Sequence, residues 1–173
     1  MRQALALHIE QVERSGHAAE AEQDLGRAGT TARQADGQYW SVYARALQEA
    51  FGIGARDAEA ASVLREGIQY HPRDVELYLQ LGGLLEESDP EAAIDLYSSF
   101  PPPSDGSGPA FDHAVCANSA VRLLIERKDW ENPSLVPQLI VVGRVLGVLN
   151  IERYVAQLDL ANQVIVRLVV VSL

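Results

Sequence analysis

The stretch WSVYARAL at residues 40–47 decides the fold of this chain, because its order of bulky and small side chains returns elsewhere at similar spacing. A related order is found in LALHIEQV at 5–12 and in YLQLGGLL at 78–85. The first residues of the three stretches lie 40 − 5 = 35 and 78 − 40 = 38 positions apart. Within each stretch the apolar residues recur at helical spacing. A period of this size predicts an array of stacked helical hairpins.

A second helical pattern follows each of these stretches. In the middle repeat, FGIG at 51–54 interrupts the first helix. Pro72 ends the second helix, since Pro disfavours helical geometry in the residue before it. In the third repeat, Asp89 is suited to cap a helix whose first turn holds Pro90. The inward-facing residues of these second helices are Ala21, Leu25 and Ala28, then Ala60, Leu64 and Gly67, then Ala93, Tyr97 and Phe100.

The two halves of the middle repeat resemble a tetratricopeptide repeat. They read Trp40-x2-Tyr43-Ala44-x2-Leu47 and Ala60-x3-Leu64-x2-Gly67-x4-Pro72. The third repeat is similar, with Tyr78-x2-Leu81-Gly82-x2-Leu85 and Ala93-x3-Tyr97, and the resemblance covers about residues 4–100. Small residues matter to it as much as large ones, because they let two helices approach closely. The first repeat fits more loosely and lacks the terminal Pro. The turn inside the second repeat is longer than the family's.

This resemblance implies an all-α fold, a right-handed α-solenoid of antiparallel helix hairpins. After residue 100, PPPSDGSGP at 101–109 predicts an exposed loop. Helical periodicity resumes over 110–127, and Asn132-Pro133 suits the start of a further helix. We predict three hairpins over 1–100, the loop at 101–109, and a degenerate fourth hairpin plus a terminal apolar helix over 110–173. This organisation amounts to about nine helices. The apolar positions expected on the last two helices are Leu135, Leu139, Val142, Leu146 and Leu149, then Ile151, Tyr154, Val155, Leu158, Ala161, Ile165 and Leu168.

The run VIVRLVVVSL at 164–173 is rich in β-branched residues and has no polar cap. An exposed segment of this kind promotes aggregation, so it needs a cover. The favoured interpretation is a last helix buried against its neighbour. Two others remain open: the natural protein continues beyond Leu173, or this apolar helix docks onto a neighbouring subunit. A solenoid normally closes with a polar-faced capping helix, and none is visible in this sequence.

Composition excludes several classes of function. There are 24 acidic and 14 basic residues, so the formal net charge is −10 and phosphate backbones are repelled. Cys116 is the single cysteine, which excludes an internal disulfide and any multi-cysteine metal cage. It also favours a reducing, cytoplasmic compartment. No uninterrupted apolar stretch reaches the roughly 20 residues needed to cross a bilayer. We therefore expect no nucleic acid, no membrane span, no metal and no cofactor.

Two other classes of function are alternatives. Asp112, His113 and Cys116 invite a catalytic interpretation, since a thiolate nucleophile needs a base nearby. A buried structural cysteine on a packing helix is the favoured interpretation, because single cysteines are usually buried. The other alternative is an RNA-binding helical-repeat protein, whose repeats have a similar period. The acidic net charge counts against it.

The favoured function is a non-catalytic scaffold or adaptor that binds a protein or peptide on its concave helix face. The resemblance implies ligand-facing positions two before, one after and five after each opening bulky residue. These positions are Gln3, Ala6 and Glu10, then Gln38, Ser41 and Arg45, then Glu76, Leu79 and Gly83. Family members that clamp a terminal carboxylate use Lys and Asn at such positions, and this chain has neither there. Charge complementarity instead favours a neutral or basic partner segment. The alternative is a solvated helix face without a partner.

Overall fold

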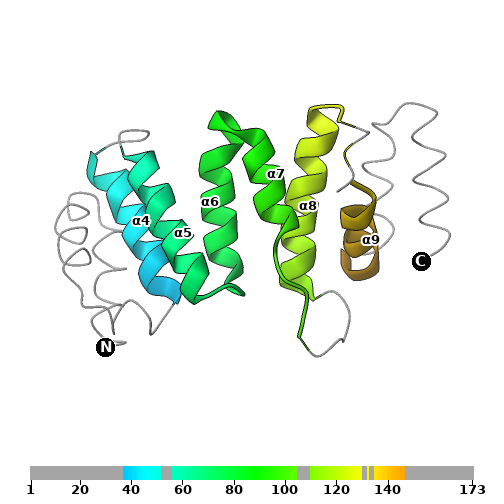
Figure 1. The fold of residues 1–173 in the computed structure, drawn as a ribbon, viewed down its shortest axis with the longest axis horizontal. Coiled ribbons are helices and arrows are strands. Elements are labelled where there is room, and N and C mark those ends of the chain that lie inside the picture. Colours follow the sequence, from blue (N-terminus) through cyan, green and yellow to red (C-terminus); the bar gives the residue numbers. More distant parts are fainter. Residues whose placement is uncertain (1–36, 52–55, 105–109, 130–131, 133–134, 147–173) are drawn as a thin grey trace. The chain divides into compact units, whose positions relative to one another are not determined.

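A computed structural model describes residues 37–51, 56–104, 110–129, 132 and 135–146 (Figure 1). Within this part of the chain all regular structure is helical, which confirms the all-α prediction for these residues. The helices are α4 (Gly37–Phe51), α5 (Asp57–Tyr70), α6 (Val75–Ser88), α7 (Pro90–Ser98), α8 (Phe111–Glu126) and α9 (Leu135–Leu146). The first predicted hairpin, the helix from Ile151 and the run at 164–173 lie outside the described residues. The solenoid and the total of about nine helices stay predictions.

The chain divides into two compact units, 1–84 and 85–173. The limit between them falls inside α6, so the first part of this helix belongs to the N-terminal unit and its end to the C-terminal unit. Each unit is described by itself below.

In the N-terminal unit, α4 and α5 form an antiparallel hairpin. Gln48 near the end of α4 donates a 3.4 Å hydrogen bond to Asp57 at the start of α5. At the other end of the hairpin, the Trp40 indole stacks on the Tyr70 ring, with centroids 5.6 Å apart. The predicted inward positions are buried, since Trp40, Ala44, Leu47, Ala60 and Leu64 are each at most 1% exposed. The helical spacing found in the sequence therefore places one apolar face of each helix against the other.

Gly67 allows the closest approach in this hairpin. A Cβ atom built on Gly67 would lie 2.7 Å from Cβ and Cγ of Trp40 and 3.2 Å from Cδ1 of Leu77. Real Cβ atoms do not approach other carbons so closely, so only glycine lets α5 pack on both Trp40 of α4 and Leu77 of α6. This confirms the expectation that a small residue is needed at this position.

The end of α5 follows the prediction from Pro72. The helix ends at Tyr70, and His71 has φ −129° and ψ 66°, outside the helical region. A short turn leads into α6, where the Asp74 side chain accepts a 3.1 Å hydrogen bond from the Glu76 backbone N–H. This bond satisfies one of the free N–H groups at the start of α6.

The first part of α6 runs parallel to α4. Asp74 lies directly against Gly37, the first residue of α4. Further along, Gln80 donates a 2.7 Å hydrogen bond from Nε2 to Ser41 Oγ. Residue numbers rise together in the two contacts, so the helices have the same direction, as the two ribbons also show (Figure 1). The bonded residues are 80 − 41 = 39 positions apart, close to the period of the sequence.

In the C-terminal unit, α8 packs against both α7 and α9. Asp89 caps α7 by accepting a 3.1 Å hydrogen bond from the Ala92 N–H, and Pro90 is the first helical residue, as predicted. The buried residues include Ala93, Tyr97 and Phe100, then Ala114, Cys116, Ala117, Ala120, Val121 and Leu124, then Leu135, Leu139 and Val142. Leu149 and the residue Pro133 lie outside the described residues.

The end of α8 contains a backbone conformation that is not predicted from the sequence. Lys128 has φ 56°, in the left-handed region that normally favours glycine. The Asp129 N–H donates to the Leu124 carbonyl at 2.9 Å, and the Lys128 N–H donates to the Ile125 carbonyl at 3.0 Å. This pair of bonds is a Schellman motif, which closes the helix with its last carbonyls satisfied. A lysine thus occupies a position for which glycine is the usual choice.

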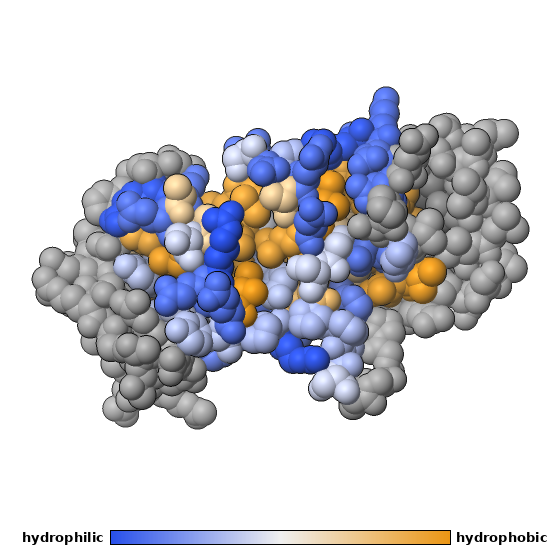
Figure 2. Space-filling model, viewed as in Figure 1, coloured by the Kyte–Doolittle hydropathy of each residue, from blue (hydrophilic) through white to orange (hydrophobic). Residues whose placement is uncertain are grey.

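The described surface is mainly polar on the face that Figure 2 shows, with hydrophobic residues visible between hydrophilic ones. Among the described residues, Tyr70 and Phe111 are the large apolar side chains that count as exposed, at 42% and 65%. Single exposed apolar residues are normal in folded proteins.

Two glycine-to-alanine substitutions should change stability in opposite directions. Gly83→Ala should raise the free energy of unfolding by about 1 kcal/mol, because alanine is the better helix former and the new Cβ meets no atom within 4 Å. Gly67→Ala should lower it by about 1–3 kcal/mol, because the new methyl group collides with Trp40. Urea unfolding followed by circular dichroism checks both. A gain from Gly67→Ala would contradict the close packing.

Lys128→Gly should stabilise the C-terminal unit by about 1 kcal/mol, because glycine adopts positive φ without steric cost. Lys128→Ala is the matched control, since it removes the same charge but keeps a Cβ. Only the glycine variant should shift the urea midpoint upward. Equal shifts in both variants would assign the effect to charge rather than to backbone conformation.

Candidate functional site

A groove in the N-terminal compact unit has a volume of about 510 Å³. Its lining residues are Gln38, Ser41, Val42 and Arg45 from α4, and Asp74 and Glu76 at the start of α6. Of the nine predicted ligand-facing positions, Gln3, Ala6 and Glu10 lie outside the described residues. Four of the other six, Gln38, Ser41, Arg45 and Glu76, lie around one hollow. A volume of this size is within the range of sites that hold small ligands or short peptide segments.

The wall that α4 contributes follows from helical periodicity. Its four lining residues occupy positions i, i+3, i+4 and i+7, which share one face of an α-helix. The opposite face carries Trp40, Ala44 and Leu47, which are buried in the hairpin. Burial of that apolar face orients the lining residues toward the groove.

The start of α6 contributes the acidic wall. Gln80 connects the two walls, because its Nε2 donates to Ser41 Oγ at 2.7 Å and to Glu76 Oε1 at 3.1 Å. Ser41 is only 7% exposed, so this link sits at the base of the groove. Glu76 is exposed, and its carboxylate has acceptor sites beyond the bond from Gln80.

Asp74 has a structural task in addition to lining the groove. One carboxylate oxygen accepts the bond from the Glu76 N–H, and the other lies against Gly37. Burial raises the pKa of Asp74 above its ordinary value, although the Glu76 N–H acts in the opposite direction. Both oxygens are thus held in place, which makes Asp74 a fixed part of the wall.

Arg45 is the cation among the described lining residues of the groove. It is half-buried, and no described residue accepts a hydrogen bond or forms an ion pair with its guanidinium. Arginine has five N–H donors, so its capacity to bind a carboxylate or a peptide carbonyl is intact within the described part of the chain.

The two other predicted residues do not line the groove. Leu79 is half-buried on α6, and Gly83 is exposed with open space around it. Sequence reasoning missed two lining residues, Val42 and Asp74. Val42 is four positions after Gln38 and shares its helix face, and Asp74 directly precedes Val75 as a helix cap, so both had a signal in the sequence.

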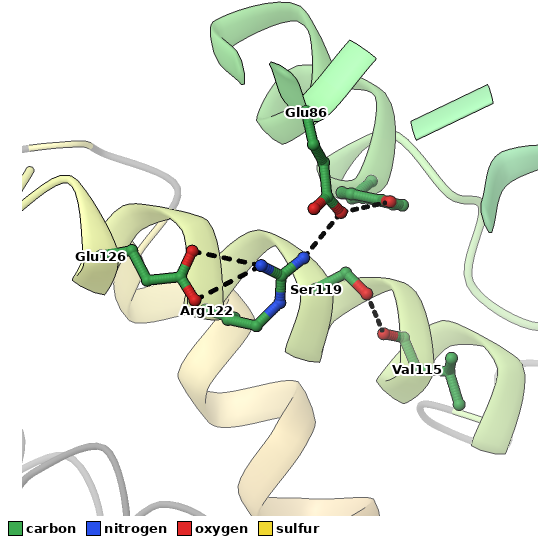
Figure 3. A network of polar contacts seen from close by, with 6 residues as sticks. Glu86, Val115, Ser119, Arg122 and Glu126 are labelled. Atoms are coloured by element: carbon green, nitrogen blue, oxygen red, sulfur yellow. Dashed lines mark hydrogen bonds and ion pairs between the residues drawn. The ribbon is translucent and has the colours of Figure 1, made fainter. Parts of the chain in front are cut away.

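A polar network in the C-terminal compact unit joins three helices (Figure 3). Arg122 of α8 donates to Glu86 at the end of α6 at 2.6 Å and to Glu126 at 3.2 Å. Tyr97 of α7 also donates to Glu86, at 2.9 Å. Burial raises the pKa of Tyr97, and the bond to Glu86 raises it further. Burial alone would lower the pKa of Arg122, but the two carboxylates outweigh this effect and raise it. The network has a structural role, because its charges satisfy one another.

The alternative catalytic group is poorly arranged for nucleophilic chemistry. Cys116 is fully buried, and burial together with Asp112 raises the pKa of its thiol to about 12. His113 faces the Phe100 ring, with centroids 6.3 Å apart, and burial lowers its pKa. A reactive cysteine requires a lowered pKa and access to substrate, and Cys116 has neither.

The described residues also lack other site types. They contain no group of three or more His, Cys, Asp or Glu side chains placed to hold a metal ion. In the same part of the chain, no helix combines the length and the apolar character needed to cross a membrane.

Comparison of the chain with protein-family models, curated proteins and solved structures finds no match. The resemblance to the tetratricopeptide repeat therefore rests on the residues and contacts described above.

The Cys116 thiol should resist alkylation in the folded protein. Because its pKa is raised to about 12 and the side chain is buried, iodoacetamide at pH 8 should modify it slowly and only through unfolding. In denaturant the same thiol should react quickly. Mass spectrometry measures the fraction of alkylated chains, and the modified site is unambiguous because the chain has one cysteine. Fast modification of the folded protein would favour the catalytic alternative.

Proposed function

We propose that this protein is a non-catalytic scaffold or adaptor of the cytoplasm, which binds a segment of another protein in the groove between α4 and α6. The observation that carries the proposal is the groove itself. It gathers residues from two helices whose first residues are 75 − 37 = 38 positions apart, and four of them are positions that the resemblance to the tetratricopeptide repeat implies as ligand-facing.

The spacing of contacts supports the repeat architecture on which this proposal depends. Ser41 and Gln80 are 39 positions apart, and the pairs Glu86–Arg122 and Glu91–Arg127 are each 36 apart. These intervals are close to the period of 35 to 38 in the sequence. Stacked repeats make contacts of this kind, because each repeat touches the equivalent parts of its neighbours.

Charge supports a protein partner over a nucleic acid. The described lining residues present two carboxylates and one guanidinium, and the whole chain carries a net charge of −10. Nucleic acids are held mainly by cations that neutralise phosphates, and carboxylates outnumber cations among these lining residues. A neutral or basic protein segment meets less repulsion there.

The proposal predicts that a partner depends on Arg45. Affinity purification of the tagged protein from its source cells should recover a stoichiometric partner. Arg45→Glu should reduce its recovery at least about tenfold, because the change removes the guanidinium N–H groups that would donate to carbonyl or carboxylate oxygens of the partner segment. Arg65→Glu is the matched control, because it makes the same charge change at an exposed position of α5 away from the groove.

The outcomes separate the possible docking surfaces. Loss of the partner in Arg45→Glu alone supports the groove. A partner that survives both changes would place docking elsewhere, with the apolar run at 164–173 as the next segment to test. If no partner is recovered with any of the three proteins, the scaffold proposal is contradicted.

A further inference from the structure

We infer that the groove recognises an extended segment carrying one basic and one acidic side chain three or four residues apart. This inference rests on the proposed function and narrows the class of partner. The basic side chain would pair with Glu76, next to Asp74, and the acidic side chain would pair with Arg45. The groove thus selects a pattern of two opposite charges rather than net positive charge alone.

The spacing follows from the parallel packing of α4 and α6. Ser41 and Gln80 are bonded, so they lie at the same level along the two helices. Arg45 is four residues beyond Ser41, and Glu76 is four residues before Gln80. At a rise of about 1.5 Å per residue, each interval spans about 6 Å, and the two charges are separated by about 12 Å along the groove. An extended chain rises about 3.3 Å per residue, so it covers this distance in three to four residues.

Both charges are available to a partner. Arg45 has no ion-pair or hydrogen-bond partner among the described residues. Glu76 is exposed and uses one oxygen for Gln80, which leaves the other oxygen for a cation. Asp74 adds negative potential beside Glu76; its Oδ1 accepts the bond from the Glu76 N–H, and its Oδ2 lies against Gly37.

The described residues between the two charges are uncharged. Ser41 and Val42 lie between the two ends, and Gln38 lies beside the acidic end. Val42 gives the intervening residues an apolar contact, and the polar side chains of Gln38 and Ser41 are suited to backbone groups.

The test selects peptides against two proteins that carry the groove charges in opposite arrangements. A random library of ten-residue peptides displayed on phage is selected against the full chain, and separately against the double variant Arg45→Glu with Glu76→Arg. The double variant keeps the net charge and reverses the direction of the charge pair. Circular dichroism confirms that both proteins have the same helix content. Selected peptides are then synthesised, and their dissociation constants are measured by fluorescence anisotropy on each protein.

The inference expects opposite charges three or four residues apart in the peptides selected on the parent chain. The peptides selected on the double variant should carry the same spacing in the reverse order. Each peptide should bind about tenfold more weakly to the other protein. Peptides that lose affinity on the double variant but carry no charge pair would overturn this inference and leave the proposed function in place. If no selected peptide distinguishes the two proteins, both the inference and the proposed groove function fail.

Discussion

The contact between Trp40 and Gly67 is the constraint on which the described part of the N-terminal unit depends. The indole is buried to 1% exposure, and Gly67 lets the α5 backbone lie directly against its Cβ and Cγ. Burying a tryptophan side chain removes about 200 Å² from water, a stabilisation of about 5 kcal/mol as an upper value. The buried Nε1 atom has no hydrogen-bond partner, which costs about 1–3 kcal/mol and is outweighed by that burial. The same glycine also admits Leu77 of α6, so one residue sets the distances among three helices.

The groove is a consequence of this packing. Trp40 points into the hairpin. The opposite face of α4, which carries Ser41 and Arg45, is therefore directed away from the hairpin and toward the groove. The α6 helix is held parallel to α4 by Asp74 at its start and by the Gln80–Ser41 bond further along. Two helices fixed in this way leave a channel with polar walls. Its charges are separated along the axis, which gives the groove a direction.

Charged residues have different tasks in the two compact units. In the C-terminal unit, Arg122 is bonded to Glu86 and Glu126, and Tyr97 completes the network. In the groove of the N-terminal unit, the Arg45 guanidinium has no such partner among the described residues. Paired charges hold neighbouring helices in register, whereas a charge without a partner retains its capacity to bind one. This difference is the physical basis for proposing recognition at the groove and a structural role for the network.

The sequence by itself determined the helices and their inward faces. Helical spacing identified Trp40, Leu64 and Leu139 as positions on apolar faces, and cap chemistry identified Asp89 and Pro90, because these signals are local to one turn. The resemblance to the tetratricopeptide repeat also implied Gln38, Ser41, Arg45 and Glu76 as ligand-facing positions, and these four line one groove. Other features depend on the tertiary structure. The link from Gln80 to Ser41, the position of Asp74 against Gly37 and the network around Glu86 join residues that are far apart in sequence. Nor does a local pattern explain why Lys128 takes positive φ, since the last carbonyls of α8 and the turn after it impose that conformation. Helix formation is decided by residues three or four positions apart, whereas the groove exists only because two helices one repeat apart are packed at a fixed distance and level.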